Sequence, residues 1–143
     1  YSDSHYGNFL VKNNKLCVID FGCLHFLNEV LVNNLKDVHK SIVNDDKYTF
    51  FQTLEKLEIL LEDTSNESRE YCYEYFKLQY EPFTKENFEF TEEWLDIATE
   101  KNINLMKEWN LPSDMVYFNK IPYGLYHILT KLHLKGNFTN IFV

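Results

Sequence analysis

Residues 1–22 contain acidic and amide side chains in an order and spacing that could bind a metal ion. Asp3 and Asn8 form the pattern Asp-x-x-x-x-Asn, and Asp20 opens the tripeptide Asp-Phe-Gly. Their oxygens suit a hard cation such as Mg²⁺, which keeps several water ligands. In phosphoryl transfer a protein mainly places the attacking oxygen and neutralises charge on the phosphates. The residue types therefore predict Asp3 as the catalytic residue that orients the attacking hydroxyl or water, and Asn8 and Asp20 as the metal ligands.

The order and spacing of the two motifs carry more information than either motif alone. An aspartate in a loop is usually a turn former or a cap, and Asp-Phe-Gly is a common tripeptide. Here both motifs stand in the order and at the separation of the catalytic loop and the metal-binding turn of protein-kinase-like folds. This agreement favours the kinase-type interpretation over coincidence.

A β-hairpin must join the two motifs. The run Lys12-Asn13-Asn14-Lys15 resembles a turn, and strand-forming residues flank it on both sides: Phe9, Val11, Leu16, Val18 and Ile19. This pattern is typical of a hairpin. We expect it to be the only convincing strand pair, and we expect its turn to set the distance between the metal ligands.

Past Gly22 the apolar residues recur at the three- and four-residue steps of helices, and about five helices are expected. Their apolar faces carry, in chain order, Leu31, Leu35, Val38 and Ile42; Phe50, Leu54, Leu57 and Leu61; Cys72, Tyr75, Phe76 and Gln79; a helix with Leu95 that runs to about Trp109; and Leu125, Ile128, Leu129 and Leu132.

The ends of these helices can also be predicted. Asn28 is a predicted N-cap, and Thr91 is another, with a hydrophobic staple between Phe90 and Leu95. Breaks and a final C-cap are expected at Asp45-Asp46, Pro82, Pro112 and Gly136-Asn137. The resulting fold class is mainly α with one small β-hairpin, in one domain over residues 1–143, with a weak boundary between residues 82 and 91.

The charge of the chain excludes one class of partner. The formal net charge is −8 and the pI is about 5.1, whereas binding of nucleic-acid phosphates requires clustered Lys and Arg. No apolar run approaches the length needed to span a bilayer, and the three cysteines lack metal or redox spacing. We expect an intracellular chain that does not bind nucleic acid.

The two motifs resemble those of a known family. Asp3-Ser4-His5-Tyr6-Gly7-Asn8 is similar to the Asp-Pro-His-Pro-Gly-Asn signature of the UbiB-like atypical kinases of coenzyme-Q biosynthesis, and Val18-Ile19-Asp20-Phe21-Gly22 is similar to their metal-binding segment. Similarity continues in the expected helix from Asn28 to Asn44, at the start of the next helix in Asp46-Lys47-Tyr48, and from Pro122 to Phe138, and it is firmest at residues 1–61. Both prolines of the signature are replaced, by Ser4 and Tyr6.

The resemblance implies a protein-kinase-like C-terminal lobe, with the catalytic loop, hairpin and Asp-Phe-Gly segment in residues 1–24 and a helical subdomain in residues 28–143. It gives Asp3 the catalytic role and Asn8 and Asp20 the metal roles. His5, Gly7, Phe21 and Gly22 match as loop-shaping positions. The family is linked to ubiquinone or other isoprenoid-lipid metabolism, with ATPase activity better supported than protein phosphorylation.

The resemblance also implies parts outside the chain. The nucleotide loop, a phosphate-binding Lys and its Glu partner would lie upstream of Tyr1, so we expect the chain to be a fragment that is inactive alone. Mg²⁺ and ATP are the cofactors expected in the full-length parent. Expected partners are the missing N-lobe and, through the parent, an isoprenoid lipid or a membrane surface. The parent would be cytoplasmic or peripherally attached to a membrane.

Other interpretations stay open. Lipid kinases of the phosphoinositide type and aminoglycoside or choline kinases share the two motifs, but Asn28 leaves little room for their substrate-recognition segment. A pseudokinase module that only binds a partner is a third possibility. Elsewhere, we expect the aromatic stretch from Tyr71 to Phe90 to be core, and His25, His39, His127 and His133 to be packed or surface residues.

Overall fold

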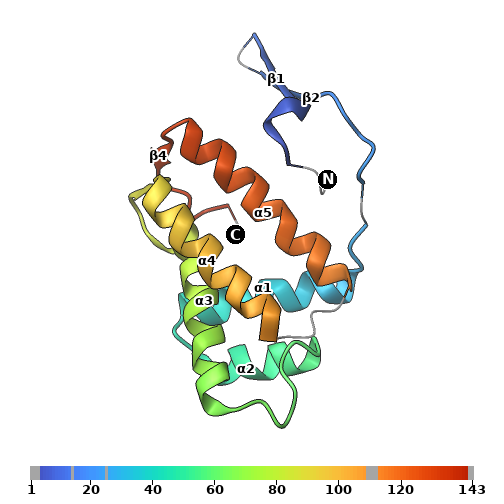
Figure 1. Ribbon diagram of the computed structural model, residues 1–143, viewed down its shortest axis with the longest axis vertical. Coiled ribbons are helices and arrows are strands. Elements are labelled where there is room, and N and C mark those ends of the chain that lie inside the picture. Colours follow the sequence, from blue (N-terminus) through green and yellow to red (C-terminus); the bar gives the residue numbers. More distant parts are fainter. Residues whose placement is uncertain (1–3, 14, 25, 109–112, 142–143) are drawn as a thin grey trace.

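A computed structural model describes residues 4–13, 15–24, 26–108 and 113–141, without the side chains of residues 105–118 (Figure 1). This part of the chain is mainly helical, with five α-helices and two small antiparallel sheets of two strands each. The expectation of a mainly helical fold with a small hairpin is confirmed. The second sheet was not predicted.

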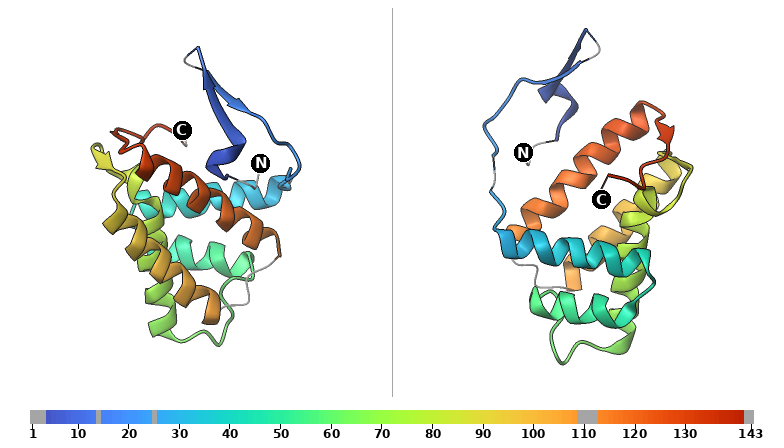
Figure 2. Two further views of the ribbon diagram at one scale, coloured as in Figure 1. Left: turned by 45° about the horizontal axis from the view of Figure 1, so that its top comes forward. Right: turned by 180° about the vertical axis from the view of Figure 1, so that it is seen from behind.

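The helices are α1 (Glu29–Val43), α2 (Lys47–Lys56), α3 (Asn66–Thr84), α4 (Glu92–Glu108) and α5 (Ser113–Lys131). A 3₁₀ turn, η1 (Tyr6–Asn8), leads into the strands β1 (Phe9–Lys12) and β2 (Lys15–Val18), and the second sheet pairs β3 (Phe88–Glu89) with β4 (Lys135–Gly136). The β1–β2 hairpin stands clear of the helical body, and an extended segment connects it to α1 (Figure 2).

Side-chain caps begin the helices where the sequence predicts them. The Asn28 Oδ1 accepts a hydrogen bond of 2.7 Å from the Leu31 backbone N–H at the start of α1. Thr91 Oγ1 accepts one of 3.2 Å from the Trp94 N–H at the start of α4. Both predicted N-caps are therefore confirmed. They satisfy backbone donors that have no partner within the helix.

The C-terminal ends of α1, α2 and α5 share a Schellman motif. In this motif a backbone N–H bonds to the carbonyl five residues earlier, as in Asp46 to Ser41 (2.8 Å), Ile59 to Leu54 (3.0 Å) and Leu134 to Leu129 (3.1 Å). The residue just before each donor has a positive φ: 53° at Asp45, 57° at Glu58 and 48° at His133. The predicted C-cap at Gly136-Asn137 is thus wrong, because His133 already ends α5 and Gly136 lies in β4.

Three further predictions about the helices are wrong, two about where a helix ends and one about which residue of α5 is buried. Pro82 does not end α3, which continues to Thr84, because a proline so near the C-terminus disrupts only the last turn. Leu61 lies beyond α2 and is 55% exposed. Among the described side chains of α5, Tyr126 and Thr130 are buried, while Leu125 is exposed. The predictions at Trp109 and Pro112 lie outside the described residues.

The core consists of two hydrophobic clusters. The first joins α1, α2 and α3 with the segment after α2 and contains Leu31, Leu35, Val38, Ile42, Phe50, Leu54, Ile59, Leu60, Cys72, Tyr73, Tyr75, Phe76 and Tyr80. The second joins β3, α4 and α5 and contains Phe88, Phe90, Trp94, Leu95, Ala98 and Tyr126. Phe83 packs against both. The aromatic stretch from Tyr71 to Phe90 is largely core, as expected.

Tyrosine hydroxyls connect the helices α3, α4 and α5 to one another. The Tyr126 hydroxyl donates to the Gln79 carbonyl at 2.9 Å, and the Tyr123 hydroxyl donates to the Ala98 carbonyl at 2.8 Å. The Tyr75 hydroxyl bonds to the Asn102 side chain at 2.8 Å. Burial raises the pKa of these phenols, that of Tyr123 to about 12. The hydroxyls therefore stay protonated and can donate at neutral pH.

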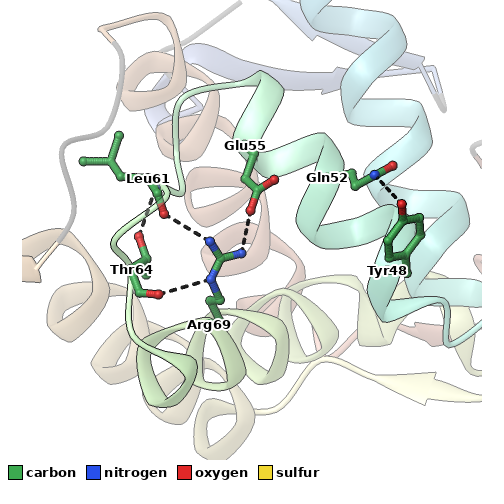
Figure 3. Close-up of polar contacts among 6 residues, drawn as sticks. All are labelled: Tyr48, Gln52, Glu55, Leu61, Thr64 and Arg69. Carbon is green, nitrogen blue, oxygen red and sulfur yellow. Dashed lines mark hydrogen bonds and ion pairs between the residues drawn. The ribbon is translucent and has the colours of Figure 1, made fainter.

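A single arginine holds the loop between α2 and α3 (Figure 3). The Arg69 guanidinium bonds to the Glu55 carboxylate at 2.7 Å and to the backbone carbonyls of Thr64 at 3.2 Å and Leu61 at 3.1 Å. A planar guanidinium can serve several acceptors at once, which suits it to this position. The loop after α2 is thereby tied to the start of α3.

Candidate functional site

The loop before β1 is shaped by His5. Its backbone caps η1 with φ −86° and ψ 139°, and its Nδ1 accepts a hydrogen bond of 3.2 Å from the Gly7 N–H. The His5 carbonyl accepts a second bond, of 2.9 Å, from the Asn8 N–H. A Cβ at Gly7 would come within 3.0 Å of the His5 ring nitrogen. Glycine therefore lets the ring close over the turn that leads into Asn8.

The ribbon of β1 and β2 brings the two motifs to the same end of the hairpin. Phe9 is paired with Val18, and beyond this pair the Ile19 N–H donates to the Asn8 carbonyl at 3.0 Å. Asn8 thus lies opposite Ile19, and Asp20 is the next residue along the chain. The predicted hairpin is confirmed: Lys12 pairs with Lys15 at its end, and Asn13 has φ 51°, while Asn14 lies outside the described residues.

The Asp-Phe-Gly segment forms a tight turn of its own. The Asp20 Oδ1 accepts a hydrogen bond of 2.7 Å from the Gly22 N–H, and a Cβ at Gly22 would lie 3.1 Å from the same oxygen. Asp20 is exposed, and the Phe21 side chain is 64% exposed. The bond orients the carboxylate through Oδ1, and Oδ2 takes no part in it.

Asp3, the predicted catalytic residue, lies outside the described residues, so its role stays a prediction. The next residue, Ser4, is described and is buried against α5. Tyr6 contacts the same helix, because the Lys131 ammonium lies 4.8 Å from the centre of its ring. Sequence reasoning did not find these contacts. The one signal was Gly124, a glycine inside a helix, which often marks close packing.

The described residues contain no group of three or more His, Cys, Asp or Glu side chains that could bind a metal ion together. An Asp and an Asn are still a suitable start for a magnesium site, since this cation is often bound by one or two protein oxygens together with water and phosphate. Along the parts of the chain that the structure describes, no helix has the length and apolar composition to cross a bilayer.

Three of the other four histidines lie among the described residues. His39 is buried in α1, its ring centre lies 5.1 Å from that of Tyr80, and burial lowers its pKa. His127 and His133 are exposed. These positions agree with the expectation of packed or surface histidines. His25 lies outside the described residues.

A surface pocket lies between α3 and α4 and is lined by Glu67, Ser68, Tyr71 and Asn104. It is open to solvent, and it includes none of the residues of the two motifs. The candidate site is the end of the hairpin because both motifs meet there.

Comparison of the chain with models of protein families gives no match, and neither does comparison with curated proteins.

Proposed function

We propose that this chain is the C-terminal lobe of a kinase-like, ATP- and metal-binding domain of the UbiB-like type. In it Asp3 orients the attacking hydroxyl or water, and Asn8 and Asp20 hold Mg²⁺. The observation that carries the proposal is the register of the ribbon. The bond from the Ile19 N–H to the Asn8 carbonyl brings an amide and a carboxylate from two separate motifs to one end of the hairpin.

The donor set at this end fits magnesium. Asp20 supplies an exposed carboxylate that the Gly22 N–H holds through one oxygen, and Asn8 supplies a neutral amide oxygen. Oxygen ligands with little total charge leave room for water and nucleotide phosphate on a hard cation. When bound, Mg²⁺ would neutralise charge on the phosphates of ATP.

The remaining motif residues shape this site. The His5 ring and carbonyl fix the turn that presents Asn8, and Gly22 fixes the carboxylate of Asp20. The parts that would bind the nucleotide from the other side belong to the N-lobe, the proposed partner. The reaction class is ATP hydrolysis or phosphoryl transfer linked to ubiquinone or another isoprenoid lipid, in a cytoplasmic or peripheral membrane-associated parent.

The start of α1 favours this type over the other kinase families. Asn28 caps α1 directly after residues 21–27. A lipid kinase or an aminoglycoside or choline kinase would require a substrate-recognition segment after the metal aspartate. The short connection supports the UbiB-like alternative.

A pseudokinase module that only binds a partner is the second candidate. The packing of Ser4 and Tyr6 on α5 favours it, because this loop would have a structural role even without catalysis. The two candidates differ in whether the hairpin end binds a divalent cation.

A titration of the chain with Mn²⁺, a paramagnetic cation that takes the same oxygen ligands as Mg²⁺, tests the proposal. We expect selective NMR line broadening of the amides of Asn8 and Asp20, and its loss in Asp20→Ala. The matched control is Asp63→Ala, which removes an exposed carboxylate outside the hairpin and should leave the broadening intact. Broadening that is absent, or that persists in Asp20→Ala, would favour the partner-binding module.

A further inference from the structure

Helix α5 lies against the loop that precedes the hairpin, and a glycine marks the contact. Gly124 lies inside α5, and an added Cβ there would come within 2.5 Å of the Ser4 Cβ and 2.6 Å of the Ser4 carbonyl oxygen. Carbon atoms that are not bonded to each other pack best about 3.5–4.0 Å apart, so both distances would be severe clashes. Ser4 itself is 6% exposed. The backbone of the loop thus rests directly on the backbone of the helix.

The substitution of this glycine has an unusual expected effect. In an ordinary helix position, alanine is more favourable than glycine. At Gly124 the methyl group meets a backbone carbonyl, which no rotation of a side chain can remove. Alanine therefore fits only if residue 4 moves away from α5.

A second contact lies on the same helix. The Lys131 Nζ is 4.8 Å from the centre of the Tyr6 ring, which in turn lies 4.2 Å from the His5 ring. Gly124 and Lys131 are about two helical turns apart and so lie on one face of α5. This face contacts the loop on both sides of His5, the residue whose ring and carbonyl fix the turn before Asn8.

We propose that Gly124 and Lys131 of α5 are positioning residues, which hold the loop of residues 4–8 in place relative to the end of the hairpin. The importance of this loop for catalysis rests on the proposed function; its docking on α5 does not. The hydrogen bonds of the ribbon hold Asn8 next to the segment that contains Asp20. Contact with α5 holds Ser4, the neighbour of Asp3 in the chain. Gly124 thus connects the last helix of the chain to the candidate active site.

Hydrogen exchange in the full chain tests the docking without any cation. In Gly124→Ala we expect the amides of Gly7 and Asn8, which bond to His5, to exchange at least about tenfold faster than in the wild type. The amides in the centres of α1 and α3 should keep their rates. The double variant Ser4→Gly, Gly124→Ala should recover part of the protection, because the clash with the Ser4 Cβ is gone and that with the carbonyl remains.

Gly136→Ala is the matched control. A Cβ there meets only the Phe138 ring, at 3.3 Å, and no part of the loop, so the exchange of Gly7 and Asn8 should not change. If Gly124→Ala prevents folding, Lys131→Gln replaces it, and faster exchange at Gly7 and Asn8 is again expected because the contact with the Tyr6 ring is lost. Unchanged exchange in every folded variant would overturn the inference.

The Mn²⁺ titration then separates the two proposals. If the hairpin end binds the cation, Gly124→Ala should weaken binding roughly tenfold, as loss of a supporting residue commonly does. Faster exchange in a chain that does not bind Mn²⁺ would leave α5 as the docking site of the loop but would refute the metal site. Exchange and affinity that both match the wild type would refute the positioning role and keep the metal site.

Discussion

Glu58 is a position at which a single substitution should increase the stability of the folded chain. It ends α2 with φ 57°, in the left-handed region that side chains with a Cβ disfavour, and it is exposed. We expect Glu58→Gly to raise the free energy of unfolding by about 1 kcal/mol, because glycine adopts this conformation without strain. Urea denaturation followed by circular dichroism measures the change.

Glu62→Gly is the control for this substitution. It removes the same charge from the same loop, and the backbone of Glu62 is not in the left-handed region. Glycine there only adds freedom to the unfolded chain and should lower the stability by a few tenths of a kcal/mol. Equal effects of the two substitutions would contradict the role of the Schellman motif.

His39 makes the stability depend on pH. Burial lowers its pKa in the folded protein, whereas in the unfolded chain it stays near its ordinary value of about 6.5. As the pH falls from neutral through 6.5 toward the lowered pKa, the unfolded chain binds a proton more readily than the folded one, so the stability decreases. We expect His39→Gln to reduce this slope between pH 7 and pH 5. Denaturation at a series of pH values measures it, and an unchanged slope would contradict the assignment.

Arg69 determines how the connection from α2 to α3 is held. Its side chain is 16% exposed, and its guanidinium bonds to Glu55 and to two backbone carbonyls, those of Leu61 and Thr64. Arg69→Met keeps much of the apolar packing but leaves these acceptors without a charged donor. We expect a loss of about 2 kcal/mol, since hydrogen bonds to charged groups exceed the usual contribution. Thermal denaturation measures the loss.

Lys47→Met is the matched control for the arginine. Lys47 also pairs with a glutamate, Glu70, at 2.6 Å, but both side chains are about half exposed. Solvent screens such pairs, so the substitution should change the stability much less. A loss as large as that of Arg69→Met would show that the backbone carbonyls add little to the arginine contacts.

The elements show which parts of the fold could be predicted from the sequence. N-caps depend on residues within one turn, so Asn28 and Thr91 could be identified. The break after α1 at Asp45-Asp46 was also predicted and is confirmed, because α1 ends at Val43 and α2 begins at Lys47. The ends of α2 and α5 were missed because Glu58 and His133 take a conformation that usually indicates glycine. Strands β3 and β4 were missed because two short segments far apart in the chain form them, and short strands carry little periodic signal.

The same limit applies to the candidate site. The ribbon between Asn8 and Asp20 could be predicted because its turn and strands are contiguous in the chain. The docking of Ser4 on Gly124 could not, since it joins the two ends of the sequence and leaves only a glycine inside a helix as its signal. Local patterns thus predict the candidate ligands, whereas the proposed positioning residues depend on long-range packing that only the structure shows.

At the scale of the whole molecule, α3 joins the two hydrophobic clusters. It supplies Cys72, Tyr73 and Phe76 to the first cluster, while Leu78 packs against the second and Phe83 against both. The Tyr126 hydroxyl bonds to the Gln79 carbonyl of the same helix from α5. Because α3 contributes side chains to both clusters, unfolding of one cluster would also remove contacts from the other and raise the free energy of the partly unfolded state. The helical body should therefore unfold in one transition.

Leu54→Ala tests this cooperativity. Leu54 is fully buried in the first cluster on α2, and its truncation leaves a cavity that should cost about 2–5 kcal/mol. Because α3 connects the clusters, we expect the denaturation midpoint to fall equally for a methyl signal of Val38, in the first cluster, and for the ring signals of Trp94, in the second. Phe90→Ala makes the reciprocal test, with its cavity in the second cluster and the same pair of probes. If the Val38 and Trp94 signals give different midpoints in either variant, the two clusters unfold independently. The boundary expected between residues 82 and 91 would then separate two units of folding.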